Sequence, residues 1–410
     1  MGVTLDIGSV EGPKTDLEPT EAPYNFPQWG RPFRLGCAVP WPEDGTSYHR
    51  SMGPLWAMAR QGGRPAQSGT SFLGAAVQDA SRYPLLELIA PRKDAKGWQL
   101  TWDWVASCDA VLLQRPATAA YLQLAKLVKA MGRKLWVEWD DDYTCIPVSN
   151  ASFSEYNAED LRPRLKELCW LADVVTVATP ELARRLPRVA EGKTVMIPNA
   201  CMPVHRANGQ PLPFMDDKRE KRVSWRGTDT HDEDVGTILP ALAELSRLPQ
   251  FSKWLWHWSG GMPWQVHDAI PRERLEQSPF CGPVFFVPML AVFAPFIHLA
   301  PLKLNRFNLC KSNLAWIEAT CAGAVVVAPD SEEWQRPGVV NYTDWRDFRD
   351  KLRKLMEEWD GGKLHPNVAL SRKFIEENLL LEKVNELRWG VIRTLMATSV
   401  AATCKKFNHR

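Results

Sequence analysis

The chain has 410 residues, of which 50 are Lys or Arg and 48 are Asp or Glu, so its formal net charge is +2. This balance gives no support to general electrostatic binding of nucleic acid or of a membrane surface, although a local basic groove stays open. Hydrophobic residues make up 45% and charged residues 24%, which is typical of a globular protein of two or three domains.

The first 30 residues are rich in Pro, Gly and acidic side chains. They contain neither a basic start nor a long apolar stretch, so they do not resemble a secretory signal. We expect residues 1–30 to be a mobile tail. Nine cysteines are scattered along the chain without any C-x-x-C pair, which favours reduced thiols in a cytoplasmic protein over a disulfide framework or a zinc site.

From residue 33 onward, short apolar runs alternate with amphipathic stretches. The expected strands are 33–39, 108–114, 134–139, 173–179 and 193–199, and the expected helices are 54–61, 119–131, 159–172 and 180–186. Strands separated by helices indicate parallel βαβ units. Residues 31–205 are therefore predicted to form an N-terminal Rossmann-like domain.

Residues 206–221 lack periodicity and are rich in Pro and charge, which is typical of a linker. A second α/β series follows, with strands at 222–227, 254–259, 284–287, 296–302 and 324–329, and helices near 232–247, 312–322, 345–358 and 370–398. It predicts a second Rossmann-like domain over 222–370, and a C-terminal helix and tail over 371–410. Two doubly wound halves would place a cleft between the carboxyl edges of their sheets, where such sheets bind ligands.

The apolar run at 283–302 is nearly long enough to span a bilayer. Pro288 and Pro295 interrupt it, and His298 lies near its end. We therefore expect a strand, a short helix and a second strand of a buried sheet, and no membrane span.

The most informative segment, 300–330, has the pattern of a strand, a loop, a helix and a strand. Polar residues gather just ahead of its helix, where free N–H groups attract phosphate: Asn308, Lys311, Ser312 and Asn313. Glu318 follows Lys311 by seven residues, so both lie on one side of the helix, and Glu318 borders the buried face. The vicinal hydroxyls of a ribose would offset the burial of this carboxylate. A surface helix with a Lys–Glu pair fits the same residues.

This segment resembles the donor-site signature of GT-B glycosyltransferases, in particular of the large retaining family with an E-x7-E motif. Residues 172–203 resemble the end of the N-terminal domain of such enzymes, and 222–235 resemble the start of their C-terminal domain. The resemblance implies that Arg226, Gly227 and Lys311 face the donor diphosphate and that Glu318 binds ribose. It also implies that the N-terminal domain binds the acceptor and that the C-terminal helix crosses back to it.

Two departures from the family pattern concern the donor sugar and the first loop. Cys310 stands where the first glutamate of the motif is expected, and in the family that glutamate contacts the donor sugar. The first loop carries the single Gly45 instead of a glycine pair. Retention of configuration is therefore an expectation from the resemblance alone.

An acidic cluster, Glu138 and Asp140 to Asp142, ends the strand at 134–139. It fits a solvated turn, a metal site of the kind that GT-A glycosyltransferases use, or an acceptor site whose carboxylates bind or deprotonate a hydroxyl. The GT-B resemblance favours the third interpretation, with Asp140, Asp141 and Asp142 as catalytic candidates and Glu138 as an acceptor ligand.

Three further residues are candidates by position. Gly45 and Arg115 are expected on the acceptor side, although Arg115 also fits a surface role beside Pro116. His231 is a catalytic candidate that could reach acceptor or donor hydroxyls, while its neighbours also fit a helix cap.

The sequence thus predicts a transferase that moves a sugar from a nucleotide diphosphate sugar, a UDP-sugar above all, to an acceptor hydroxyl without a metal or other cofactor. Expected acceptors are a cell-envelope glycan or a hydroxymethylated base in phage DNA, in a bacterial cell or a phage-infected host. The alternatives are a GT-A-like metal-dependent transferase that uses Asp140–Asp142, and a non-catalytic protein that binds nucleotide sugars.

Overall fold

The computed structural model describes residues 32–39, 44–58, 86–89, 92–94, 97–202, 204–205, 211–212, 214 and 218–407. The predicted tail over 1–30 and most of the predicted linker over 206–221 lie outside these residues.

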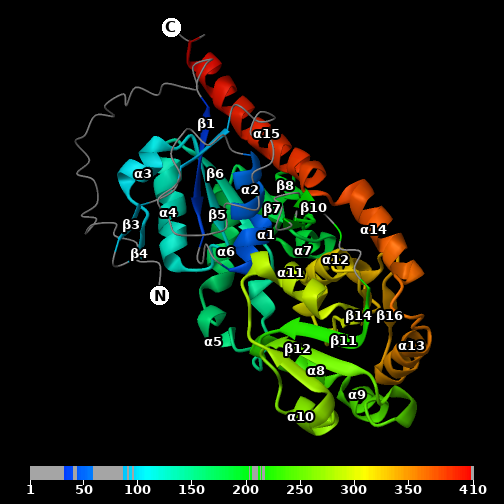
Figure 1. Ribbon diagram of the computed structural model, residues 1–410. Coiled ribbons are helices and arrows are strands. Elements are labelled where there is room, and N and C mark those ends of the chain that lie inside the picture. The colour runs from blue at the N-terminus through cyan, green and yellow to red at the C-terminus, as the bar shows by residue number, and fades with distance from the viewer. Residues whose placement is uncertain are drawn as a thin grey trace.

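The first sheet is built from the N-terminal half of the chain (Figure 1). In the described residues it has six parallel strands in the order β2-β1-β5-β6-β7-β8. The strands are β1 (Phe33–Ala38), β2 (Leu86–Ile89), β5 (Ala110–Gln114), β6 (Lys134–Trp139), β7 (Val174–Val177) and β8 (Thr194–Met196). The side hairpin pairs β3 (Arg92–Asp94) with β4 (Gly97–Gln99).

Both faces of this sheet are covered, which explains why its central strands are apolar throughout. Leu112 of β5 and Trp136 of β6 belong to one hydrophobic core, while Val111 and Leu135 belong to another. Neighbouring residues of a strand point to opposite faces, so each strand feeds both cores. The helices of this half are α1 (Gly45–Arg50), α2 (Met52–Met58), α3 (Trp102–Ser107), α4 (Ala119–Ala130), α5 (Phe153–Tyr156), α6 (Leu161–Leu171) and α7 (Pro180–Arg185).

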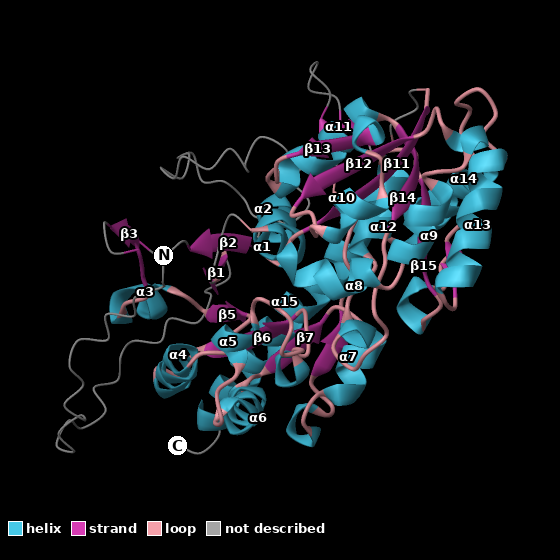
Figure 2. Cartoon of the chain, turned by 90° about the horizontal axis from the view of Figure 1, so that it is seen from below, coloured by secondary structure: helices cyan, strands magenta, loops and turns pink. Residues whose placement is uncertain are grey.

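The second sheet repeats this plan, with described strands in the order β13-β12-β11-β14-β15-β16, all parallel. Its strands are β11 (Glu220–Gly227), β12 (Leu255–Gly260), β13 (Leu275–Ser278), β14 (Pro295–Leu299), β15 (Val325–Pro329) and β16 (Val340–Tyr342). Its helices are α8 (Asp232–Gly236), α9 (Leu239–Leu245), α10 (Gln265–Ala269), α11 (Pro283–Phe293), α12 (Leu314–Cys321), α13 (Trp345–Glu357) and α14 (Pro366–Asn378). Tryptophans fill its core: Trp225 of β11 stacks on Trp258 of β12 with ring centroids 5.2 Å apart. Figure 2 shows the two sheets as separate layers with helices between and around them.

Two expected helices are each divided in two, the one near 232–247 into α8 and α9, and the one near 370–398 into α14 and the following helix Leu381–Phe407. One expected strand is a helix. Residues 284–287 were expected as a strand, but they lie in the helix α11, which has Pro283 in its first turn. A short apolar run does not distinguish a buried strand from a buried helix by periodicity. Phe286 and Leu290 are buried, whereas Phe285 and Val292 are exposed. No helix among the described residues is both long and apolar enough to cross a membrane.

The chain passes between the two halves twice. After β8 it leaves the N-terminal half through Cys201, and after α14 it returns and enters α15 (Leu381–Phe407) (Figure 1). The two passages touch, because the Cys201 backbone N–H donates to the Leu379 carbonyl at 2.7 Å. Asn385 of α15 donates to the Pro54 carbonyl of α2 at 3.2 Å, which anchors the helix on the first half.

Candidate functional site

A cleft of about 470 Å³ lies between the two halves of the molecule. Its walls come from the carboxyl ends of strands in both sheets and from the loops that follow them. The charged or polar residues on the N-terminal wall are Asp44, Thr46, His49, Arg50, Arg115, Asp140, Asp141 and Asn199, and those on the C-terminal wall are Arg226, Thr228, Thr230, His231, Lys311 and Ser312. This is the position that doubly wound sheets use for ligands.

The loop after β11 passes close to its own strand at Gly227. A Cβ atom at this position would lie 2.4 Å from the Trp225 ring, so the close approach requires glycine. The loop then presents His231, whose Nδ1 lies 2.7 Å from the Asp234 carboxylate. Asp234 is itself fixed, since its other oxygen accepts hydrogen bonds from the Lys303 backbone and from Asn308. His231 is therefore held at the rim of the cleft through its Nδ1.

Helix α12 points its first turn at the cleft, which is lined by Ser312, Leu314 and Ala315. The first N–H groups of a helix have no partner within the helix, and they favour anions. The Ser312 hydroxyl accepts a 2.7 Å hydrogen bond from Asn199 of the N-terminal half. Lys311 lies ahead of the helix with its Nζ 3.7 Å from Asp141 across the cleft. This region combines a cation with free helix amides.

Glu318 lies one layer below the cleft surface. Its carboxylate is bound by Arg226 at 2.5 Å and by His49 at 3.2 Å, and its side chain is only 3% exposed. Burial alone would raise the pKa of the Glu318 carboxyl, but Arg226 and His49 hold it below the ordinary value. The expected partner of this carboxylate was a ribose. In this structure Arg226 and His49 offset its desolvation, and Glu318 does not line the cleft.

The three adjacent aspartates after β6 point in different directions. Asp140 accepts a hydrogen bond from the Tyr143 hydroxyl at 2.5 Å. Asp141 faces Lys311, and burial raises the pKa of its carboxyl although Lys311 opposes that shift. Asp142 turns away and caps the following turn through Thr144. Asp140 and Asp141 line the cleft and Asp142 does not, so the carboxylates do not converge on one point as ligands of a shared metal would.

Arg115 and Gly45 both line the N-terminal wall of the cleft. Arg115 follows β5 with a positive φ of 48° and forms an ion pair with Asp44. Asp44 caps α1, whose first residue is Gly45, by accepting a 2.6 Å hydrogen bond from the Ser47 N–H. Sequence reasoning missed Asp44, although its place before a short helix is a typical N-cap signal.

Besides Glu318, three predicted ligand-binding residues lie outside the cleft lining and support its walls. Glu138 is buried and is bound by Arg50 at 2.6 Å. The Asn308 side chain donates to Asp234, and the Asn313 side chain donates to the Glu333 carbonyl at 3.2 Å. These residues position their neighbours, because their polar groups are already engaged within the fold.

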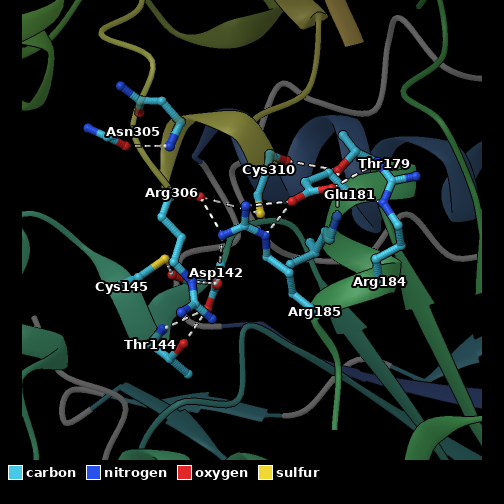
Figure 3. A network of polar contacts seen from close by, with 12 residues as sticks. Asp142, Thr144, Cys145, Thr179, Glu181, Arg184, Arg185, Asn305, Arg306 and Cys310 are labelled. Carbon is cyan, nitrogen blue, oxygen red and sulfur yellow. Dashed lines mark hydrogen bonds and ion pairs between the residues drawn. The ribbon is translucent and has the colours of Figure 1, made fainter. Parts of the chain in front are cut away.

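A network of polar contacts joins the halves beside the cleft, as Figure 3 shows. Thr179 donates to the Cys310 carbonyl at 2.9 Å, and Arg185 donates to the Arg306 carbonyl at 3.0 Å. Cys310, which stands in place of the expected glutamate, is fully buried. Its side chain is therefore part of this domain contact and not of the cleft lining.

No family model and no curated protein matches the chain. Solved structures do resemble it. A mutant of TarM from S. aureus, in complex with Fondaparinux, alpha-GlcNAc-glycerol and UDP, is 12% identical with a TM-score of 0.51, covering 70% of this chain and 55% of TarM. A glycosyltransferase from Rickettsia africae is 12% identical with a TM-score of 0.55, covering 90% of this chain and 99% of that one.

The chain thus spans little more than half the length of TarM. At these identities the likeness shows the fold, which is the predicted GT-B fold of two Rossmann-like halves.

Proposed function

We propose that the chain is a glycosyltransferase that moves a sugar from a UDP-sugar to an acceptor hydroxyl. One observation carries the proposal: within a single cleft, Lys311 and the first turn of α12 face the carboxylates Asp140 and Asp141. The first group suits a leaving diphosphate and the second suits a hydroxyl that loses its proton. The presence of UDP in the TarM complex supports the choice of nucleotide.

On the donor side, Lys311 supplies the charge. Arg226 lines the cleft too, but its guanidinium is paired with Glu318 at 2.5 Å and lies over the Phe286 ring at 4.1 Å. The Lys311 Nζ lies 3.7 Å from Asp141, which is longer than a direct hydrogen bond, and 4.7 Å from the centre of the Phe307 ring. We therefore assign Lys311 and the α12 amides to the diphosphate, and Arg226 to a more fixed contact beside them.

On the acceptor side, Asp141 is the proposed proton acceptor or hydrogen-bond partner of the reacting hydroxyl. Burial raises its pKa, and a higher pKa makes a carboxylate a better base. His231, fixed by Asp234, is proposed to hold a hydroxyl or phosphate oxygen through Nε2. Asp140 and Arg115 complete this wall. The chain's own residues perform these roles without a metal.

We infer retention of configuration from the resemblance of 300–330 to the donor signature of the retaining family. The acceptor that we propose is a glycan hydroxyl, since the net charge of +2 gives little electrostatic attraction to DNA. We place the reaction in the cytoplasm of a bacterial cell or a phage-infected host, because the scattered cysteines, eight of which the structure describes as free, suit reduced thiols.

The test measures UDP release from a panel of UDP-sugars, first without acceptor and then with glycans or 5-hydroxymethylcytosine DNA. We expect slow release without acceptor and faster release with a glycan. A protein that binds the nucleotide sugar but never releases UDP would be a binding protein. A DNA-dependent rate that falls steeply with salt would replace the glycan by DNA. The anomeric configuration of the product, read by NMR, tests retention.

A further inference from the structure

We propose that a second cavity, beside the main cleft, is a saccharide subsite that holds an acceptor sugar unit next to the reacting one. The cavity measures about 210 Å³ and lies among α6, α7 and the turn after β6. Asp141 lines both this cavity and the main cleft, so the two spaces adjoin at that residue. That the bound sugar belongs to the acceptor rests on the proposed function. That the cavity binds a sugar does not.

The carboxylate of Asp142 is the centre of this cavity. Its side chain is 7% exposed, and Oδ1 accepts hydrogen bonds from the backbone and hydroxyl of Thr144 at 3.1 and 2.6 Å. Oδ2 is buried and has no hydrogen-bond partner among the residues that the structure describes. Burying a carboxylate oxygen without a hydrogen-bond partner costs free energy. A ligand that hydrogen-bonds to this oxygen removes that cost, which favours binding.

Two guanidinium groups flank this oxygen without reaching hydrogen-bond distance, so a ligand atom to one side could contact the oxygen and a guanidinium together. Arg185 Nη1 is 3.9 Å and Arg306 Nε is 3.8 Å from Oδ2 (Figure 3). Both distances exceed the range of a direct N–H···O hydrogen bond. A ligand group that contacts both must donate to the carboxylate and accept from a guanidinium. A hydroxyl does both, while the dianion of a phosphomonoester has no proton to donate.

The remaining lining agrees with a neutral, polyhydroxylated ligand. Trp139 and Tyr143 supply aromatic surface, and Leu165 and Leu182 supply apolar surface. Arg185 is also paired with Glu181 at 2.5 Å, which reduces the positive charge available to an anion. Rings with hydroxyl edges and apolar faces fit such a mixture of aromatic and charged groups.

Arg306 comes from the C-terminal half, whereas Asp142 and Arg185 come from the N-terminal half. The subsite is therefore complete only with both halves in contact. An acceptor that occupies it extends across Asp141 into the main cleft, so the favoured acceptor is an oligosaccharide and not a single sugar.

The experiment measures binding of methyl glycosides of neutral hexoses and N-acetylhexosamines to the full chain by calorimetry, without any donor. Asp142→Asn and Arg306→Gln are compared with Arg353→Gln, an exposed arginine on α13 far from both cavities in sequence and outside both linings. UDP binding is measured on the same samples. The Arg306 side chain is 59% exposed, so Arg306→Gln should fold normally. This variant therefore tests the subsite even if Asp142→Asn fails to fold.

We expect at least one glycoside to bind saturably, with affinity lowered about tenfold or more by Asp142→Asn and by Arg306→Gln, and unchanged by Arg353→Gln. UDP affinity should be the same in all four proteins. The subsite is overturned if no glycoside binds, if both substitutions leave glycoside affinity intact, or if inorganic phosphate displaces the glycoside. If the unmodified chain does not bind UDP, that result would instead contradict the proposed function.

Discussion

The two walls of the cleft stand on sheets of the same size and the same parallel plan, yet they offer opposite chemistry. The C-terminal wall presents a glycine loop, the first turn of α12 and Lys311. The N-terminal wall presents Asp140, Asp141 and the Asp44–Arg115 pair. The sheets provide the position, while the few residues after each strand decide which substrate each wall can serve. Experiments that disable one wall at a time test this division.

The largest effect is expected from Asp141→Asn on the N-terminal wall. Removing a general base typically lowers the rate about 10²–10⁴-fold. Transfer to acceptor should fall by that factor, while UDP affinity stays near normal because the donor wall is intact. Steady-state UDP release with and without acceptor measures this. Equal loss of both rates would mean that Asp141 serves the donor.

The raised pKa of Asp141 also predicts a pH dependence. The carboxyl must be deprotonated to act as a base, so activity should fall on the acid side at a higher pH than the ordinary aspartate value of about 3.9 would give. This acid limb should be absent from the residual activity of Asp141→Asn.

Glu318→Gln tests the contact that joins the walls below the surface. It leaves Arg226, which lines the cleft, and the buried His49 without the Glu318 carboxylate, and breaking a buried pair costs about 3–5 kcal/mol of unfolding free energy. Because the pKa of Glu318 is lowered in the folded state, its contribution is present above about pH 4.3 and is lost as pH falls through the folded value. Denaturant unfolding at several pH values measures the difference.

A matched control replaces both partners, as Glu318→Leu with Arg226→Met. Apolar replacement of a whole buried pair is often neutral, so this double variant should be more stable than Glu318→Gln. If Glu318→Gln unfolds like the unmodified chain, the buried pair does not stabilise the domain contact.

Lys311→Ala disables the C-terminal wall. Loss of one preorganised group at the leaving diphosphate costs about 10²–10³-fold in turnover. Lys311→Arg should restore part of the rate, because the charge is retained. Here both acceptor-dependent and acceptor-free UDP release should fall, in contrast to Asp141→Asn. A normal rate in Lys311→Ala would remove the main argument for the donor wall.

The smallest effect is expected from excess EDTA, which should leave the rate unchanged. Asp140, Asp141 and Asp142 point toward three different partners, so they are poorly arranged as common ligands of one ion. Complete loss of activity that a divalent metal restores would revive the GT-A-like interpretation of this cluster.

The sequence predicted the fold because its central strands carry continuous apolar runs separated by amphipathic helices. The short edge strands β2, β13 and β16 gave no such signal and were missed. Helix α11 was mistaken for a strand since it is apolar on nearly every side, with residues buried toward both halves and others exposed. Its type depends on tertiary contacts that no local pattern carries.

The location of the site could be predicted from the sequence, but many of the contacts between its residues could not. Strand ends and the start of α12 correctly directed attention to Asp141, Arg226 and Lys311, which line the cleft. Which partner each would meet depends on the other half of the molecule. Arg226 neutralises Glu318 from a strand 92 residues away in sequence, and nothing in the segment 300–330 indicates this.

The two chain passages between the halves have a mechanical consequence. They are joined where Cys201 donates to Leu379 and pairs with Leu380. Two chain connections that are hydrogen-bonded to each other act as a single hinge between the halves. They restrain twisting and sliding of the halves but leave rotation about their common line as the softest motion. Opening of the molecule should therefore separate Lys311 from Asp141, and Arg306 from Asp142, in a single swing.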